Sequence, residues 1–341
     1  MIEKKEKYDI AVVGATGAVG LRILSTLEER NFPVGRLRLL ASSRSVGQKL
    51  PFMEQVIEVE ELRENSFDGM DIALFSAGSL ISRKYAPIAV ELGCIVIDNS
   101  SAWRMDSNIP LIVPEVNPSA LGKKFSIIAN PNCSTIQMVV ALKPIHDKYR
   151  ALRVFVSTYQ SVSGSGQRAI EELRLQSRNI LDGKPVQKSV YPHQIAFNCL
   201  PHIDVFLENG YTKEEMKMID ETHKILGDRS IEVSPTAVRV PVFYSHSESI
   251  SVETELPMKV EEIKDLLSSS PGISLIDNPE KNEYPLAIDA HGKGGVFVGR
   301  VRTDINRDNI VNFWVVSDNL LKGAAYNAVQ IAELALKRAG I

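Results

Sequence analysis

The chain has 341 residues, which favours two domains over a single core. Its 44% hydrophobic and 24% charged residues are typical of a globular protein, and a net charge of −3 argues against a dedicated nucleic-acid binder. Three scattered cysteines exclude a disulfide framework and no apolar run approaches the roughly 20 residues of a membrane span, so we expect a cytoplasmic protein with no nucleic-acid or membrane partner.

The N-terminal part of the chain has the pattern of a strand, a turn, a helix and a second strand. Residues 8–13 are almost all apolar, as in a parallel strand that is covered on both faces. A glycine-rich run follows over 14–20, leucine and isoleucine recur at helical spacing over 21–27, and residues 36–41 form the next strand. A glycine run in this βαβ context is typical of a dinucleotide site.

The glycines of that run are spaced GxxGxxG, at Gly14, Gly17 and Gly20. The first permits a tight turn, the second lets the backbone approach a pyrophosphate, and the third lets the helix pack closely on the strand. The alternative is a tight strand-to-helix turn that binds no ligand.

The end of the second strand indicates which dinucleotide would bind. Sites for NAD place an Asp or Glu there for the ribose hydroxyls, whereas this chain has Ser42, Ser43, Arg44 and Ser45. Hydroxyl groups and a guanidinium suit a 2′-phosphate. The sequence therefore favours NADP, with a polar turn that merely contains an arginine as the alternative.

The rest of the chain predicts an α/β protein with two domains. A Rossmann-type doubly wound parallel sheet continues through strands at 71–75 and 94–97 and a helix at 81–92. Further strands are expected at 153–162, 230–240, 248–255 and 311–316, and helices at 166–178, 213–226, 259–268 and 323–336. We expect an NADP-binding domain of residues 1–133 with 323–341, and a catalytic and dimerisation domain of residues 134–322 that is α+β with a mixed sheet.

A cysteine stands at the most informative junction of the sequence. Residues 127–129 read as the end of a buried strand, Asn130-Pro131-Asn132 breaks it, and Cys133 then begins an apolar run of helical length. Unpaired backbone N–H groups and the helix dipole favour a thiolate at a helix start, which makes Cys133 a candidate nucleophile. The alternative is a small buried hydrophobic residue.

Two segments could supply partners for this cysteine. The loop after the strand at 153–162 contains Gln160 among small residues, and it could approach a ligand closely. In the segment from Arg239 to His246, Pro241 and the Tyr244-Ser245 step permit a bend that would bring a guanidinium and an imidazole to one site. The alternative for the loop with Gln160 is a flexible surface loop. The alternative for the segment from Arg239 to His246 is an edge strand with an exposed histidine.

Two further sets of charged residues are ambiguous. Glu221 and Lys224 are i,i+3 neighbours on a predicted helix, a spacing that usually forms a solvated surface ion pair. Arg104 follows a predicted strand of the first sheet, so it would lie at the carboxyl edge where anions bind.

Six segments, in this order, resemble the aspartate-β-semialdehyde dehydrogenase family and span almost the whole chain. They are GATGAVG at 14–20, DNSSAWR at 98–104, NPNCST at 130–135, YQSVSG at 159–164, RVPV at 239–242 with SHS at 245–247, and DNLLKGAA at 318–325. The glycine run is shared with many enzymes, whereas the cysteine segment and the arginine–histidine segment are specific.

The resemblance implies a fold like that of glyceraldehyde-3-phosphate dehydrogenase and a homodimer or homotetramer. It implies NADPH-dependent reductive dephosphorylation of L-4-aspartyl phosphate to L-aspartate 4-semialdehyde and phosphate, through a thioacyl intermediate on a cysteine. That reaction leads to lysine (through diaminopimelate), threonine, methionine and isoleucine. No metal is needed, and the sequence contains no metal-ligand cluster.

Carried over by motif position, the resemblance makes Cys133 the nucleophile, His246 the general acid/base, and Gln160 the group that orients the acyl intermediate. The glycine run and three other segments would contact the cofactor. These positions are Gly14, Thr16, Gly17, Ala18, Val19, Gly20, Arg44, Ser45, Ser163, Gly164 and Asn319.

For the substrate, the resemblance implies that Arg239 binds the α-carboxylate and Glu221 the ammonium group, while Arg104 and Lys224 bind phosphate. A rival reading is N-acetyl-γ-glutamyl-phosphate reductase, with the same chemistry on an acylated substrate. The cysteine segment and an acidic residue for a free ammonium favour the aspartyl substrate. A non-catalytic NADP-sensing protein is the remaining alternative.

Overall fold

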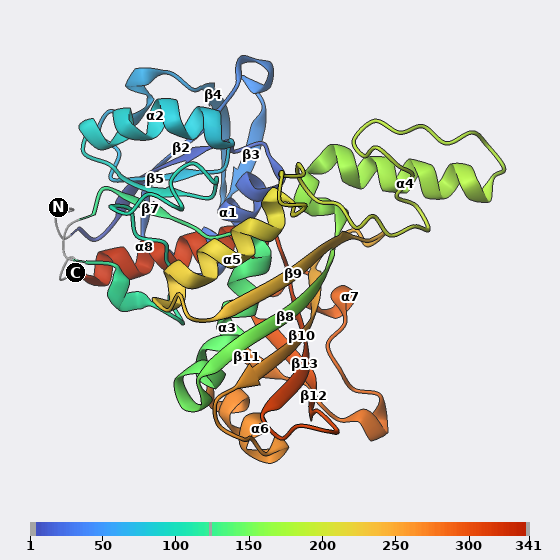
Figure 1. The fold of residues 1–341 in the computed structure, drawn as a ribbon. Coiled ribbons are helices and arrows are strands. Elements are labelled where there is room, and N and C mark those ends of the chain that lie inside the picture. The colour runs from blue at the N-terminus through green and yellow to red at the C-terminus, as the bar shows by residue number, and fades with distance from the viewer. Residues whose placement is uncertain (1–4, 123–124, 339–341) are drawn as a thin grey trace. The chain divides into compact units, whose positions relative to one another are not determined.

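The computed structural model describes residues 5–122 and 125–338. By its internal contacts the chain divides into unit 1, the described residues of Met1–Asn132 and Ala324–Ile341, and unit 2, Cys133–Gly323. Each unit contains one β-sheet (Figure 1).

Unit 1 contains a sheet of order β3-β4-β2-β1-β5-β6-β7, in which only the β3–β4 pair is antiparallel. Its strands are β1 (Tyr8–Val13), β2 (Val34–Ala41), β3 (Lys49–Phe52), β4 (Gln55–Glu61), β5 (Ile72–Phe75), β6 (Ile95–Asp98) and β7 (Ile127–Ala129). Its helices are α1 (Ala18–Glu29), α2 (Ser79–Glu91) and α8 (Tyr326–Arg338).

Alternate residues of these strands feed two cores, one on each face of the sheet. Ile10 and Val12 pack with α1 and α8, whereas Ala11 and Val13 pack with α2. Nearly all-apolar strands are what a sheet buried on both faces requires. The predicted doubly wound, Rossmann-type sheet is therefore confirmed.

Unit 2 contains a mixed sheet of order β11-β12-β13-β10-β8-β9, in which β8–β9 and β11–β12 are parallel. Its strands are β8 (Ala151–Gln160), β9 (Glu232–Arg239), β10 (His246–Thr254), β11 (Ile273–Leu275), β12 (Val296–Thr303) and β13 (Ile310–Ser317). Its helices are α3 (Cys133–Tyr149), α4 (Gln167–Leu181), α5 (Lys213–Leu226), α6 (Val260–Ser269) and α7 (Ala287–Ala290). The predicted mixed α+β sheet is confirmed.

Helix α3 is the central helix of unit 2. It packs against β8, β10, β12 and β13 and against α5 and α6, and every residue from Ser134 to Leu142 is buried. A helical stretch that is covered on all sides needs no polar stripe, which explains why residues 136–142 are apolar apart from Gln137. Its first residue, Cys133, therefore begins a helix whose following residues, 134–142, are all buried.

The structure differs from the expected elements at the C-terminal helix. A π-helical turn (Leu321–Ala325) precedes α8, which begins at Tyr326 rather than at 323. The carboxylate of Asp318 accepts the N–H groups of Leu320 and Leu321 and so satisfies the start of this turn. Strands β3, β4, β11 and β12 were not predicted.

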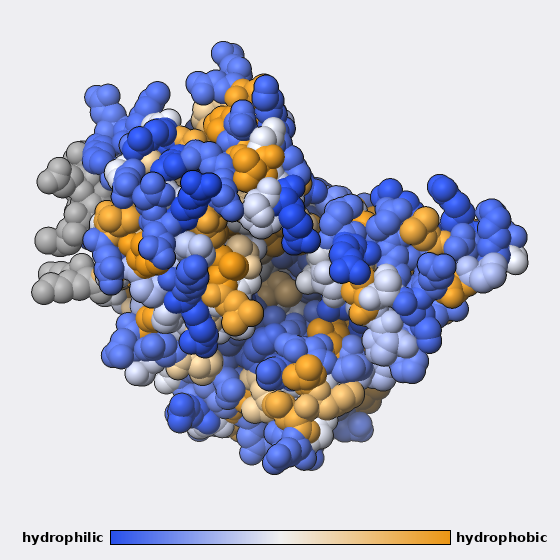
Figure 2. All heavy atoms as spheres, turned by 90° about the horizontal axis from the view of Figure 1, so that it is seen from above, coloured by the Kyte–Doolittle hydropathy of each residue, from blue (hydrophilic) through white to orange (hydrophobic). Residues whose placement is uncertain are grey.

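Figure 2 shows hydrophilic side chains over most of the face in view, with apolar side chains in separate patches. Among residues 5–122 and 125–338, no helix has the length and apolar character to cross a membrane.

Candidate active site

Three strand ends of unit 2 bring the predicted polar residues together. Gln160 ends β8 and pairs with Arg239, which ends the parallel strand β9. His246 begins β10 on the other side of β8, after Ser245 turns the chain with a φ of 70°. The bend expected between Arg239 and His246 is thus a strand connection, and both residues lie at one end of the sheet.

The loop after β8 binds both of them through the backbone of Ser161. The Ser161 N–H donates to His246 Nδ1 at 3.1 Å, and Arg239 Nη1 donates to the Ser161 carbonyl at 2.7 Å. A Cβ at Gly164 would lie 3.1 Å from Arg239 Nη1 and 3.4 Å from His246 Nε2. Glycine therefore lets the backbone lie directly against the two reactive side chains.

Cys133 belongs to the same cluster. A Cβ added to Gly323 would lie 2.7 Å from Cys133 Cβ and 3.6 Å from Asn319 Cβ. Asn319 Oδ1 in turn accepts the Ser161 hydroxyl at 3.1 Å. Unit 2 therefore brings Cys133, Asn319, Ser161 and His246 together from α3, the turn after β13, the loop after β8 and β10.

Burial sets the charge state of the imidazole. His246 is fully buried, which lowers its pKa well below the usual range, and the nearby Arg239 charge lowers it further. The Ser245 carbonyl acts the opposite way and is the weakest of the three influences. His246 is consequently neutral at physiological pH.

Arg239 keeps part of its guanidinium available for a ligand. It is 5% exposed, and among the described residues its Nε has no hydrogen-bond partner. The guanidinium carbon also lies 6.0 Å from the ring centroid of Tyr191. A buried planar fork with an unused donor suits a carboxylate ligand.

Gln160 contacts the carboxylate of Glu214, a residue that the sequence analysis did not identify as a site candidate. Its Nε2 donates to Glu214 Oε1 at 3.2 Å, and Lys217 Nζ lies 3.1 Å from Glu214 Oε2 and 2.8 Å from Asp204. Burial opposes the charge of Lys217, but Glu214 and Asp204 raise its pKa above the usual value. An ammonium and a carboxylate thus lie next to Gln160.

The sequence contains the same ExxK spacing twice on α5. Glu221 and Lys224 follow Glu214 and Lys217 by seven residues, so both pairs lie on one helix face two turns apart. Glu221 is 1% exposed, which excludes the solvated surface ion pair considered as its alternative. The repeat of the spacing was the signal that could have identified Glu214 and Lys217.

Arg104 lies in unit 1, after the carboxyl end of β6. It is buried, and its Nε and Nη2 donate to the carbonyls of Asn130 and Asn99 at 2.9 and 2.7 Å. Those bonds fix the guanidinium at the edge of the parallel sheet, where the sequence placed it.

The glycine-rich turn borders a hollow of about 640 Å³ in unit 1. A Cβ at Gly14, whose φ is 85°, would lie 3.0 Å from Ser76 atoms, and one at Gly20 would lie 2.2 Å from the Gly14 carbonyl oxygen. The lining also includes Gly17, Thr16, Ser42, Ser43 and Arg44, at the carboxyl ends of parallel strands. Size, glycines and hydroxyls all fit a nucleotide.

The predicted cofactor residues do not all lie at that hollow. Ser45 accepts a hydrogen bond from Thr16 at 3.3 Å beside it, while Ala18 and Val19 begin α1. Ser163, Gly164 and Asn319 belong to unit 2, in the cluster around His246. A carboxylate the sequence interpretation missed, Glu61 at the end of β4, also lines the hollow.

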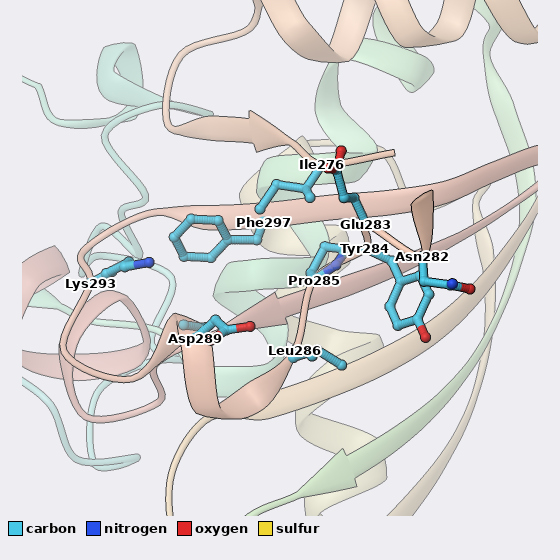
Figure 3. Close-up of a pocket in the computed structure, with 10 residues that line it drawn as sticks. Ile276, Asn282, Glu283, Tyr284, Pro285, Leu286, Asp289, Lys293 and Phe297 are labelled. Atoms are coloured by element: carbon cyan, nitrogen blue, oxygen red, sulfur yellow. The ribbon is translucent and has the colours of Figure 1, made fainter. Parts of the chain in front are cut away.

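A second hollow, of about 260 Å³, lies in unit 2 between the loop before α7 and β12 (Figure 3). Its lining includes the charged residues Glu283, Asp289 and Lys293 and the rings of Tyr284 and Phe297. None of the predicted site residues lines it.

Comparison with known proteins identifies the relatives of this chain. Residues 9–124 match the family model of the semialdehyde dehydrogenase NAD binding domain, and residues 142–322 match that of the semialdehyde dehydrogenase dimerisation domain. An aspartate-semialdehyde dehydrogenase of Aquifex aeolicus is 58% identical over 97% of this chain and 98% of its own. One from Bacillus subtilis is 53% identical over 95% and 96%.

Solved structures agree in fold. Aspartate semialdehyde dehydrogenase II of Vibrio cholerae, complexed with ASA, matches with a TM-score of 0.95 and 51% identity over 98% of this chain and 99% of that one. The enzyme of Candida albicans with NADP matches with a TM-score of 0.75 and 26% identity over 98% and 99%.

We predict that iodoacetamide distinguishes the three cysteines, which are all thiols. Burial and then Asp71 raise the pKa of Cys94 to about 12, so at pH 8 this thiol stays protonated and unlabelled. Cys133, at the start of α3, should react about 10-fold faster than exposed Cys199 because the helix start favours its thiolate. Peptide mass spectrometry measures all three rates.

The control for this labelling is Cys133→Ala, which should remove the fast phase and leave the slow labelling of Cys199 intact. Native-state labelling of Cys94, or faster labelling of Cys199 than of Cys133, would contradict the assignment.

Proposed function

Since the chain belongs to the aspartate-semialdehyde dehydrogenase family, we propose that it reduces L-4-aspartyl phosphate to L-aspartate 4-semialdehyde and phosphate with NADPH. The observation that supports this most is the cluster of Cys133, His246, Arg239 and Gln160 in unit 2. The product would serve the synthesis of lysine through diaminopimelate, and of threonine, methionine and isoleucine.

The proposed catalytic sequence assigns one role to each residue. Cys133 thiolate attacks the acyl carbon and phosphate leaves, so that a thioester forms on Cys133. NADPH, when bound, supplies the hydride that reduces this thioester. His246 acts on the oxygen that becomes negative in each tetrahedral intermediate, and Gln160 orients the acyl group.

We propose that Arg239 binds the α-carboxylate of the substrate and that Glu214 binds its ammonium group. Glu214 is supported because it contacts Gln160 directly. For phosphate, we propose Lys217, which has the same spacing from Glu214 as Lys224 has from Glu221. Arg104 is proposed for phosphate on its motif position alone. Glu221 and Lys224 remain the alternative pair. A carboxylate beside Gln160 also favours a free ammonium over the acylated substrate of N-acetyl-γ-glutamyl-phosphate reductase.

For the cofactor, we propose NADP rather than NAD, bound by unit 1. Arg44, Ser42 and Ser43 line the hollow where a 2′-phosphate would lie. The carboxylate of Glu61 forms an exposed ion pair with Arg63, whose Nη2 lies 2.8 Å away. We further propose that unit 1 is the NADP-binding domain and unit 2 the catalytic and dimerisation domain.

We propose a homodimer formed through one face of the sheet in unit 2. Phe155 and Tyr159 stand on that face 47% and 39% exposed, and Trp314 packs on Tyr159 with 5.4 Å between ring centroids. Between β8, β9 and β10 the face has a shallow hollow of about 230 Å³. Sedimentation of the pure protein tests this, since a mass of one chain would contradict it. The three thiols, one of which is the proposed nucleophile Cys133, support a reducing, cytoplasmic location.

We predict phosphate-dependent reduction of NADP by L-aspartate 4-semialdehyde, followed at 340 nm as an ordinary assay of NADPH. Cys133→Ala should lower kcat by roughly 10⁴-fold or more, because no other nucleophile replaces the thiolate. Cys199→Ala is the matched control and should keep wild-type activity. Activity with N-acetyl-L-glutamate 5-semialdehyde alone would favour the rival substrate, and NADP binding without either activity would favour the sensor.

We predict that Arg44→Ala raises the KM for NADP by about 10–100-fold and leaves the KM for NAD nearly unchanged. The loss of one charge-assisted hydrogen bond to the 2′-phosphate corresponds to a change of that size. Steady-state kinetics with both cofactors measures this. Arg36→Ala, an exposed arginine of β2 that does not line the hollow, is the control. Equal changes for NADP and NAD would show that Arg44 does not contact the 2′-phosphate.

We predict that Glu214→Gln raises the KM for L-aspartate 4-semialdehyde by about 10–100-fold, because it removes the negative partner of the ammonium group. The same change at Glu221 tests the alternative pair on the same helix face. If Glu221→Gln alone raises this KM while Glu214→Gln does not, the assignment of the ammonium site reverts to Glu221.

A further inference from the structure

A histidine with no role in the proposed mechanism contacts two segments that carry site residues in unit 2. His291 lies in the loop between α7 and β12, two residues before Lys293, which is labelled in Figure 3. Its side chain is partly exposed, and its ring contacts Asp318 through an edge and Tyr244 through a face. Asp318 lies in the turn after β13, and Tyr244 lies in the connection that leads into β10.

The side chain of Asp318 joins the loop after α7 to the turn after β13. His291 Nδ1 lies 2.9 Å from Oδ2, and the N–H of Gly292 donates to the same oxygen at 2.8 Å. Oδ1 accepts the N–H groups of Leu320 and Leu321 at 2.8 and 3.3 Å. The backbone N–H groups mark both oxygens as acceptors, so Nδ1 of the imidazole is the donor to Oδ2. Asp318 is fully buried, and these bonds fix the start of its turn.

The residue after Asp318 belongs to the cluster around His246. Asn319 Oδ1 accepts the Ser245 N–H at 3.0 Å. The same atom accepts the hydroxyls of Ser163 and Ser161 at 3.0 and 3.1 Å. A fixed Asp318 therefore fixes the backbone from which Asn319 reaches these partners, and Asn319 is a position where the resemblance implies a cofactor contact.

The second contact of the ring is a stack on Tyr244. The ring centroids lie 4.2 Å apart, with 13° between the ring planes. The next residue, Ser245, has a φ of 70°, and His246 then begins β10. A non-glycine residue keeps that left-handed conformation only when its surroundings enforce it. The N–H bond to Asn319 restrains Ser245 itself, and the stack restrains the residue before it.

We propose that His291 is a positioning residue for the active site. Its hydrogen bond to Asp318 holds the turn that carries Asn319. Its stack on Tyr244 holds the segment that leads to His246. This inference rests on the proposed function, and it leaves the general acid/base role of His246 unchanged.

The two contacts of one ring should affect different kinetic constants. Asn319 is expected to contact the cofactor, so the hydrogen bond to Asp318 should act on the KM for NADP. His246 is expected to act in the chemical step, so the stack on Tyr244 should act on kcat. A merely structural contact would change both constants together or neither of them.

Two substitutions each remove one contact and keep the other. His291→Phe keeps the ring and loses the donor, so the KM for NADP should rise by about 10-fold with kcat changed less than about 2-fold. His291→Asn keeps an N–H close to the position of Nδ1 and loses the ring, so kcat should fall by about 3–10-fold with the KM for NADP changed less than about 2-fold. Equal changes in the two variants, the reverse division, or wild-type constants in both would overturn the proposal.

A second histidine of unit 2 provides the matched control. His202 stacks on Phe206 with 4.3 Å between ring centroids and 14° between planes, in the segment before α5. His202→Phe should keep both constants at the wild-type value. In addition, Tyr244→Leu should lower kcat as His291→Asn does, and the two changes together should cost no more than either alone. Additive losses would contradict a route through the stack.

Hydrogen exchange tests the positioning without any substrate. In His291→Phe, a peptide that contains Leu320 and Leu321 should exchange at least about 10-fold faster than in wild type, while a peptide that contains Ser245 keeps its rate. In His291→Asn, the peptide with Ser245 should be the faster one. Unchanged exchange of both peptides in both variants would overturn the proposal. If the exchange pattern is as expected but wild type lacks activity with L-aspartate 4-semialdehyde, the proposed function fails and the positioning by His291 stands.

Discussion

The site depends on the two backbone groups of Ser161. Its N–H donates to His246, and its carbonyl accepts from Arg239. Backbone groups do not titrate or change rotamer, so they fix the imidazole and the guanidinium more firmly than side chains would. Because Ser161 directly follows β8, which pairs with both β9 and β10, the geometry of the sheet itself sets the distance between the two side chains (Figure 1).

Close backbone approach serves both units in the same way. Gly164 lets the loop after β8 lie against His246 and Arg239, and Gly323 lets the turn after β13 lie against Cys133. In unit 1, Gly20 allows α1 to approach the Gly14 carbonyl. A side chain at any of these positions would fill space that a reactant, a catalytic group or a packed helix occupies.

Much of this was predictable from the sequence, and the exceptions have physical reasons. Apolar strands and the glycine run identified the Rossmann-type sheet, and the break before Cys133 identified the start of a buried helix. The sequence interpretation selected Glu221 and did not consider Glu214; both lie on one helix face, and only the tertiary position of Gln160 distinguishes them. The network of Asn319 was also hidden, because it joins segments that are far apart in the chain.

The most direct test of the account is to trap the covalent intermediate on Cys133. Protein mixed with L-4-aspartyl phosphate in the absence of NADPH is quenched with acid and digested for mass spectrometry. The account predicts one aspartyl group on the peptide that contains Cys133, with one phosphate released per chain. An adduct on another residue, or phosphate release that persists in Cys133→Ala, would contradict it.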